Sequence, residues 1–338
     1  NVTSVGAVNM TGTSITGTGT LTLAGDVTTN ASGTTASINA PLTLGVTSRT
    51  FAVPDGGANP DLTLSAAVSG AAGITKAGTG LINVFGINNY TGLTTINAGT
   101  FRLGSVSALG TTALGTIINS GGVLDLNGIN YAALEPLLIN GTGISSGGAL
   151  VNGSASPATY AGLLTLGASS SIITNNGSIS VSNPGTITGP GFNLILGGST
   201  GGTISSIIGT GTGEVIKNGS GTWTISASNT FTGGVTIDAG TLRLANTGSL
   251  NSVSPNSVTF GAASTGVLQL NGNSVTVSGL NTNAIVGTPV VETNAGGIAT
   301  LTINTPGANT FEGTLQNGGS GTLAITKTGA GSLTLSGN

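Results

Sequence analysis

The chain has 338 residues, of which 61 are Gly, and it contains no Cys and no His. Only 4% of its residues are charged, and six basic and nine acidic side chains, spread thinly, give a net charge of −3. This composition excludes a disulfide framework, a Cys or Ser–His nucleophile, a zinc site of ordinary type and a basic surface that would bind nucleic acid. No apolar run approaches the ~20 residues of a membrane-spanning helix, so we expect no membrane span.

Short strands are predicted along the whole chain. Apolar residues alternate with polar, mostly hydroxylic, residues at 21–23, 93–96, 124–126, 242–244, 301–303 and 333–335. This period of two is typical of a strand with one apolar face, and no segment sustains a helical period. Gly, Asn and Ser separate the strands, because turns with positive φ need Gly or Asn. The least strand-like segment is 131–138, where Pro136 would interrupt any helix.

An internal repeat relates distant parts of the chain. Lys76 and Lys217 lie 141 positions apart, and so do Arg102 and Arg243, in matching sequence. A third copy begins at Lys327 and continues to the last residue. Recurrence over such a distance favours stacked coils over a propeller or a sandwich, because each coil must bury its inward side chains on a similar coil. The sequence therefore predicts one continuous β-solenoid over residues 1–338. At roughly 20 residues per coil it would make about 17 coils.

A shorter repeated pattern consists of an aromatic residue followed two positions later by Gly. We expect these residues to be structural positions of the repeat, with the rings packed inside or capping the stack at equivalent corners. An exposed platform for carbohydrate is the alternative. The pairs are Tyr90 and Gly92, Tyr160 and Gly162, Phe231 and Gly233, and Phe311 and Gly313.

The stretch KAGTGLINVFGINNYTGLTTINAGTFRLG, residues 76–104, resembles the autotransporter-associated β-strand repeat, also called the passenger-associated transport repeat. Further copies lie at 217–244, where Trp223 replaces a usual Leu, and at 327–338, where the copy is truncated. The resemblance implies a right-handed parallel β-helix with short strands and Gly/Asn turns. It also implies export to the surface of bacteria, often as part of a large adhesin.

Residues with catalytic or ligand-binding chemistry are sparse. Among the acidic residues, only Asp55 and Asp61 lie close together in sequence, and we interpret their segment as a loop with Asx turns, with a site as the alternative. The recurring lysines and arginines are interpreted as surface side chains that cover a strand face or pair locally, with a charged ligand ladder as the alternative. We therefore predict no catalytic, metal-binding or cofactor-binding residue, no cofactor and no enzymatic activity.

Three functional hypotheses follow. The first is a structural extracellular β-solenoid that assembles end to end into a surface fibre, sheath or stalk, because neither terminus contains a recognisable cap and sparse charge weakens repulsion between copies. The second is a monomeric autotransporter-type passenger adhesin that binds a glycan or a host protein. The third, a polysaccharide-active enzyme, would need clustered acids. The expected partners are thus other copies of the chain, or a glycan or cell-surface partner, at the surface of a bacterium or outside it.

Overall fold

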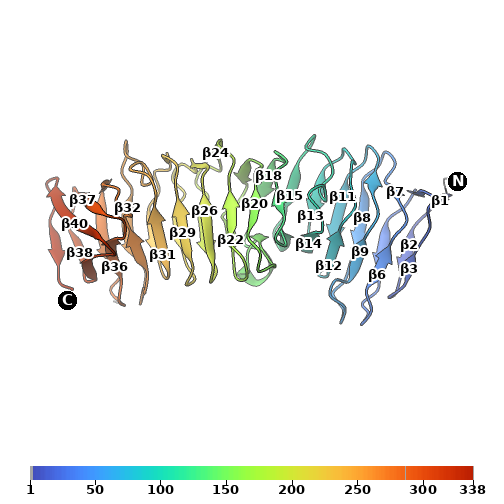
Figure 1. Ribbon diagram of the computed structural model, residues 1–338, viewed down its shortest axis with the longest axis horizontal. Coiled ribbons are helices and arrows are strands. Elements are labelled where there is room, and N and C mark those ends of the chain that lie inside the picture. Colours follow the sequence, from blue (N-terminus) through green and yellow to red (C-terminus); the bar gives the residue numbers. More distant parts are fainter. Residues whose placement is uncertain (1–2, 286, 338) are drawn as a thin grey trace. The chain divides into compact units, whose positions relative to one another are not determined.

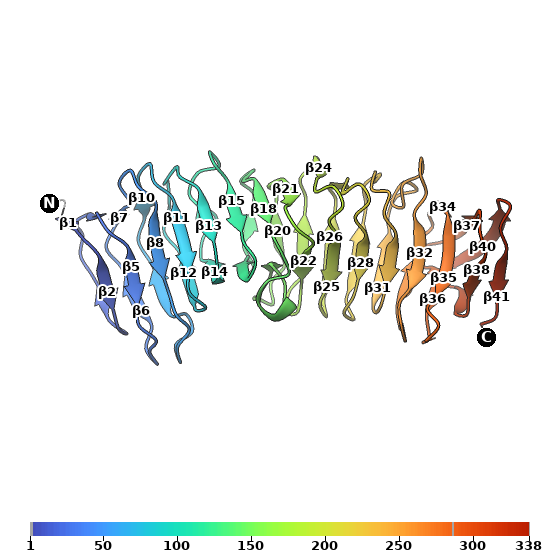
Figure 2. The same ribbon diagram turned by 180° about the vertical axis from the view of Figure 1, so that it is seen from behind.

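The computed structural model describes residues 3–285 and 287–337. The chain divides into two compact units, Asn1–Ser171 and Ile172–Asn338. In each unit, short parallel strands lie side by side in stacked coils (Figure 1; Figure 2 shows the opposite side). The described residues form no α-helix, and their one helical segment is the 3₁₀ turn η1, Ile144–Ser146. The prediction of an all-β parallel β-solenoid is confirmed. That the whole chain forms a single domain stays a prediction.

Unit 1 contains two long parallel sheets, named here after the repeat residues on them. The lysine sheet carries Lys76 and has the order β2 (Val8–Met10), β5 (Val27–Thr29), β8 (Arg49–Ala52), β11 (Ile74–Ala77), β13 (Thr94–Ile96), β15 (Thr116–Ile118), β18 (Leu137–Ile139) and β21 (Leu164–Leu166). The arginine sheet carries Arg102 and has the order β3 (Ser14–Ile15), β6 (Ala36–Ile38), β9 (Leu62–Leu64), β12 (Leu81–Val84), β14 (Gly99–Leu103), β16 (Gly122–Asp125) and β19 (Leu150–Val151). The remaining strands are β1 (Thr3–Val5), β4 (Leu21–Leu23), β7 (Leu42–Thr43) and β10 (Val68–Ser69) in one sheet, and β17 (Asn130–Tyr131) with β20 (Ala158–Tyr160) in another.

Unit 2 repeats this arrangement, and β22 (Ser170–Ile173) spans the boundary between the units in sequence. Its lysine sheet carries Lys217 and contains β25 (Leu194–Gly197), β28 (Val215–Lys217), β30 (Val235–Ile237), β32 (Ser257–Phe260) and β35 (Gly279–Thr282). Its arginine sheet carries Arg243 and contains β23 (Ile179–Val181), β26 (Gly201–Ile204), β29 (Thr222–Ile225), β31 (Thr241–Leu244), β33 (Val267–Gln269), β36 (Val290–Thr293) and β39 (Thr314–Asn317). The smaller groups are β24 (Thr186–Ile187) with β27 (Ile207–Ile208), β34 (Val275–Val277) with β37 (Gly297–Asn304) and β40 (Gly321–Thr328), and β38 (Asn309–Phe311) with β41 (Leu333–Leu335).

Coil length varies because turns differ in length while strands keep their register. Thr3 pairs with Leu21, 18 positions later, whereas Asn130 pairs with Thr159, 29 positions later. The described residues make about 14 coils, fewer than the 17 expected from a uniform length of 20 residues. The extra residues lie in loops, where they do not interrupt the stack of strands.

The core is built from side chains that repeat at every second position of each strand. In the lysine sheet of unit 1, the ladder partners Phe51, Ile96 and Ile118 lie in one row and are fully buried. The neighbouring positions of the same strands, such as Thr75 and Thr95, are half-buried and face outward. Each fully buried Ile or Phe contributes about 1.5–3 kcal/mol relative to an exposed one, so the stacking of apolar side chains along this row stabilises the coils.

Candidate functional site

Lys76 lies inside unit 1, in the inward row of the lysine sheet. Its Nζ donates hydrogen bonds to the carbonyls of Ala77 at 2.9 Å, Gly78 at 2.6 Å and Ala98 at 3.1 Å, so it joins two successive coils. Burial lowers the pKa of Lys76 to about 8, against the opposing effect of the Asp61 carboxylate. The ammonium is therefore retained at neutral pH, and all three of its protons are used within the fold.

The second repeat contains the same arrangement. Lys217 Nζ donates to the carbonyls of Asn218 and Gly219 at 2.7 Å each and to that of Ala239 at 2.9 Å, and burial lowers its pKa to about 8. Lys327, in the third copy, is exposed. The interpretation of the recurring lysines as surface side chains is thus wrong for the first two copies. The glycine-containing turn after each lysine is the sequence signal, because Gly78 and Gly219 have positive φ and point their carbonyls at the ammonium.

The recurring arginines lie on the outer side of the coils and pair with the next coil. Arg102 Nε donates to Asp125 Oδ2 at 2.8 Å. In unit 2, Arg243 Nε donates to Gln269 Oε1 at 2.5 Å, and Gln269 Nε2 donates to Glu292 Oε1 at 2.8 Å. These partners occupy matching register positions, so the arginines pair locally and form no ladder of free charges for a ligand.

Replacing Asp125 with alanine should lower the free energy of unfolding by about 2–3 kcal/mol, because Asp125 Oδ1 also accepts the backbone N–H groups of Asn127 at 2.9 Å and Gly153 at 2.7 Å. Arg102→Ala should cost no more than about 1 kcal/mol, since its side chain is 25% exposed and its loss leaves those two bonds in place. Chemical denaturation of both variants checks this, and equal losses would contradict it.

The four repeat aromatics, Tyr90, Tyr160, Phe231 and Phe311, are completely buried. The Tyr160 ring stacks on Tyr131 of the preceding coil with ring centroids 5.7 Å apart. An exposed carbohydrate platform built from these rings, the alternative in the sequence analysis, is therefore wrong.

The glycine that follows each ring packs against the backbone of the preceding coil. None of the four glycines has positive φ, so close approach and not backbone conformation requires the missing side chain. A Cβ would lie 2.2 Å from Gly73 N at Gly92, 1.8 Å from Glu135 O at Gly162, 2.2 Å from Gly213 O at Gly233 and 2.4 Å from Pro289 O at Gly313.

Unit 1 also contains a buried carboxyl group that the sequence did not predict. Glu135 is completely buried; its Oε1 accepts a hydrogen bond from Thr116 Oγ1 at 2.9 Å, while its backbone carbonyl accepts one from the Tyr160 hydroxyl at 2.8 Å. Burial raises the pKa of Glu135 from its ordinary value of 4.5 to about 7, although the Thr116 bond opposes this change. Its environment thus favours the protonated acid.

Glu135→Gln should remove a loss of stability that occurs between about pH 4.5 and pH 7. The pKa of Glu135 is higher in the folded state, so the unfolded state releases its proton first and wild-type stability falls as the pH rises through this window. We expect the variant to match the wild type at pH 4 and to be roughly 3 kcal/mol more stable at pH 8. Denaturation of both proteins at both pH values is the measurement. The same difference in free energy of unfolding between variant and wild type at pH 4 and pH 8 would contradict the prediction.

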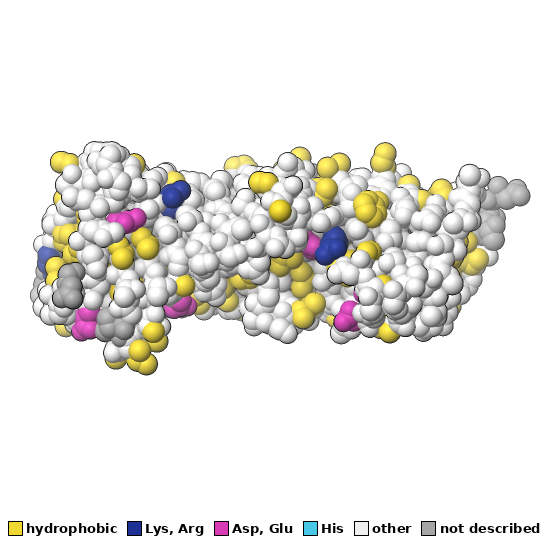
Figure 3. Space-filling view, turned by 60° about the horizontal axis from the view of Figure 1, so that its bottom comes forward, with side chains coloured by type: hydrophobic (Ala, Val, Ile, Leu, Met, Phe, Trp, Pro, Cys, Tyr) yellow, Lys and Arg dark blue, Asp and Glu magenta, His cyan; other side chains and the backbone are white. Residues whose placement is uncertain are grey.

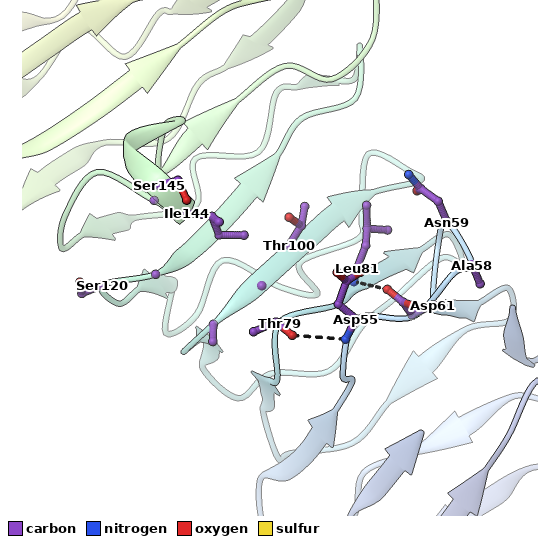
Figure 4. Close-up of a pocket in the computed structure, with 14 residues that line it drawn as sticks. Asp55, Ala58, Asn59, Asp61, Thr79, Leu81, Thr100, Ser120, Ile144 and Ser145 are labelled. Carbon is purple, nitrogen blue, oxygen red and sulfur yellow. Dashed lines mark hydrogen bonds between the residues drawn. The ribbon is translucent and has the colours of Figure 1, made fainter. Parts of the chain in front are cut away.

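A groove of about 680 Å³ lies on unit 1, above the turns that join the lysine sheet to the arginine sheet (Figure 4). Five successive coils form it. The outer two have long connections, nine residues at 53–61 and ten at 140–149, whereas the three between them turn within two or three residues, at 78–80, 97–98 and 119–121. The long connections are the walls, and the short turns together with the first residues of β12 and β14 are the floor.

One wall is held in place by Asp61. Its Oδ1 accepts the N–H of Gly56 at 2.9 Å, and its Oδ2 accepts the N–H of Leu81 at 2.8 Å, which fixes the loop to β12. Asp55 is exposed, and its N–H donates to Thr79 Oγ1 at 3.3 Å. The Asp61 carboxylate thus stabilises the conformation of the loop. The segment that contains Asp55 and Asp61 also lines the groove.

Unit 2 has no counterpart of the first wall. The corresponding connections between its lysine and arginine sheets are three residues at 198–200, four at 218–221, three at 238–240 and six at 261–266. The counterpart of the second wall is 283–289, which has seven residues against ten and includes one residue outside the described part of the chain. The nine-residue loop at 53–61 is therefore a feature of unit 1.

An apolar patch lies on the outward face of the lysine sheet of unit 1. Leu93, Ile117, Pro136 and Leu138 surround a hollow of about 310 Å³ together with Leu114, which is 63% exposed. In unit 2, the positions that correspond to Ile117 and Leu138 hold polar side chains, Thr259 and Asn281.

No group of three or more His, Cys, Asp or Glu side chains that could hold a metal ion occurs in the described part of the chain. Within the same residues, no helix is long and apolar enough to cross a membrane. On the face that Figure 3 presents, charged side chains appear singly or in pairs among uncharged polar groups. Uncharged polar side chains and backbone thus make up most of that face.

Comparison with known proteins agrees with the repeat. The passenger-associated-transport-repeat family matches residues 74–103, 215–244 and 325–338, so the recognition of this repeat from the sequence is confirmed. The chain is 29% identical over 294 residues to the Adhesin BmaC autotransporter of Brucella suis biovar 1 (strain 1330). This match covers 80% of the chain but only 8% of that relative's length. No solved structure matches the chain.

Proposed function

We propose, from the three passenger-associated transport repeats that this chain carries, that it is a surface-exposed β-solenoid through which a bacterium attaches to a partner. The repeats and the similarity to an autotransporter adhesin support a location at the cell surface or outside the cell. The partner is a glycan or a protein of another cell.

The observation that carries this proposal is the difference between the interior and the surface of the two repeats. The buried lysines and aromatics are equivalent in both, and they hold coils together. The loop at 53–61 occurs where unit 2 has a three-residue turn, and the loop at 140–149 is three residues longer than its counterpart at 283–289. Ile117 and Leu138 of the apolar patch occur where unit 2 has Thr259 and Asn281. Surface features that the fold does not need are candidates for recognition.

The proposed role is not enzymatic. The acids with described contacts have structural partners: Asp61 and Asp125 accept backbone N–H groups, Glu135 is buried, and the two carboxylate oxygens of Glu292 accept the side-chain amides of Gln269 and Gln316. Asp55 and Asp61 both line the groove, but both carboxylate oxygens of Asp61 are held by backbone N–H groups, so the two do not form the pair that glycoside hydrolysis uses.

Attachment of coated beads to cells tests the proposal. Beads that carry the full chain should bind cultured epithelial cells in greater number than beads that carry the same chain after heat denaturation. Pretreatment of the cells with glycosidases or with protease then identifies the class of partner. Equal attachment of native and denatured beads would overturn the proposed function.

End-to-end assembly into a fibre, sheath or stalk is the second candidate, favoured by the low charge of 4%, which weakens repulsion between stacked copies. Electron microscopy of the purified chain at increasing concentration tests it. Fibres with a regular axial repeat would support end-to-end assembly, and discrete particles at every concentration would contradict it.

A further inference from the structure

We propose that the groove of unit 1 binds a neutral, hydroxyl-rich oligosaccharide. This inference rests on the proposed adhesive function and names the ligand class for one site. The shape of the groove, the groups that line it and its charge support this ligand class.

The shape suits a short chain of sugars. Adjacent coils of a parallel stack lie ~4.8 Å apart, so walls on the first and fifth of five coils stand about 19 Å apart. The volume of about 680 Å³ lies within the range of small-molecule sites, roughly 300–1,000 Å³. The floor is a row of short turns, one in each coil, which offers a series of regularly spaced positions to successive units of a linear ligand.

The lining is rich in groups that both donate and accept hydrogen bonds. Hydroxyls come from Thr79, Thr100 and Ser120 on the floor and from Ser145 on the second wall, and the Asn59 amide lies on the first wall (Figure 4). Because each sugar hydroxyl also donates and accepts, such a surface matches it in either orientation.

Two aliphatic side chains interrupt this polar surface. Leu81 lies on the floor, and Ile144, which is 44% exposed, lies on the second wall. They would pack against the C–H faces of sugar rings, which removes apolar surface from water on both sides.

The charge of the groove favours a neutral ligand. Asp55 contributes an exposed carboxylate, which repels an anion. Lys76 lies beneath the floor, but its three protons are already held by backbone carbonyls, and both oxygens of Asp61 are held by backbone N–H groups. An anionic sugar would therefore find no available cation, and a single exposed carboxylate holds a cation only weakly.

The test is isothermal titration calorimetry of the full chain with defined probes: cellotetraose, maltotetraose, tetra-N-acetylchitotetraose, tetragalacturonate as an anion and spermine as a cation. Thr100→Arg and Ser120→Arg each place a long side chain on the floor. Thr241→Arg is the matched control, because Thr241 occupies the position of Thr100 in the second repeat and is half-buried like it. Melting curves select the variants that stay folded.

We expect at least one neutral tetrasaccharide to bind the wild type and Thr241→Arg equally, and to bind either floor variant at least ~10-fold more weakly. Binding of no neutral probe, unchanged binding to a folded floor variant, or a preference for tetragalacturonate or spermine would each overturn the proposal. If native beads attach to cells while no neutral probe binds, the groove inference fails and the adhesive function stands. If neither binds, both fail.

Discussion

Gly162→Ala should lower the free energy of unfolding by at least about 4 kcal/mol. The new Cβ would lie 1.8 Å from the Glu135 carbonyl oxygen and 2.7 Å from Cε1 of the buried Tyr160 ring, so the two coils would have to separate. Cores resist such overpacking, and a clash with backbone has no flexible side chain to yield. Denaturation monitored by circular dichroism measures the loss.

Gly33→Ala is the matched control in the same unit. No atom lies within 4 Å of the Cβ that it would add, and its φ is outside the left-handed region. Its free energy of unfolding should change by less than about 1 kcal/mol, and the restricted unfolded chain favours a small gain. Similar effects of the two substitutions would contradict the assignment of the aromatic-x-Gly pairs to crowded coil corners.

Lys76→Met should cost about 3 kcal/mol. Methionine fills much of the same space, but the carbonyls of Ala77, Gly78 and Ala98 lose their donor, and buried carbonyls without partners are costly. Lys217→Met should behave alike. The same denaturation experiment applies.

Lys327→Met provides the comparison, because Lys327 is exposed and its acceptors remain open to water. Its cost should stay below about 1 kcal/mol. If Lys76→Met cost no more than Lys327→Met, the desolvation of the buried ammonium would offset its three hydrogen bonds, and the lysine would not hold the coils together.

The strands were largely predictable from the sequence. The predicted strands at 21–23 and 333–335 coincide with β4 and β41, and that at 242–244 lies within β31. These predictions depend on a period of two and on glycine in the turns, and both are local properties. The segment 131–138, which looked least like a strand, contains the end of β17, the buried Glu135 and the start of β18.

Interactions between coils were not predictable in the same way. The buried ammonium of Lys76 donates one of its hydrogen bonds to the carbonyl of Ala98, 22 positions later. The strand register that brings these two residues together is not visible in either segment of the sequence alone. The walls of the groove are farther apart still, at 53–61 and 140–149. Their alignment depends on the length of every coil between them, and a uniform coil of 20 residues would have misplaced them.

Hydrogen exchange resolved along the full chain tests most directly the claim that the repeat builds a rigid interior while the long loops remain available for a ligand. The amides of Ile74, Lys76, Val215 and Lys217, which lie in buried strands, should exchange slowly, and those of 53–61 and 140–149 should exchange faster as a group. Rapid exchange in those strands, or protection of the two loops equal to theirs, would contradict the account.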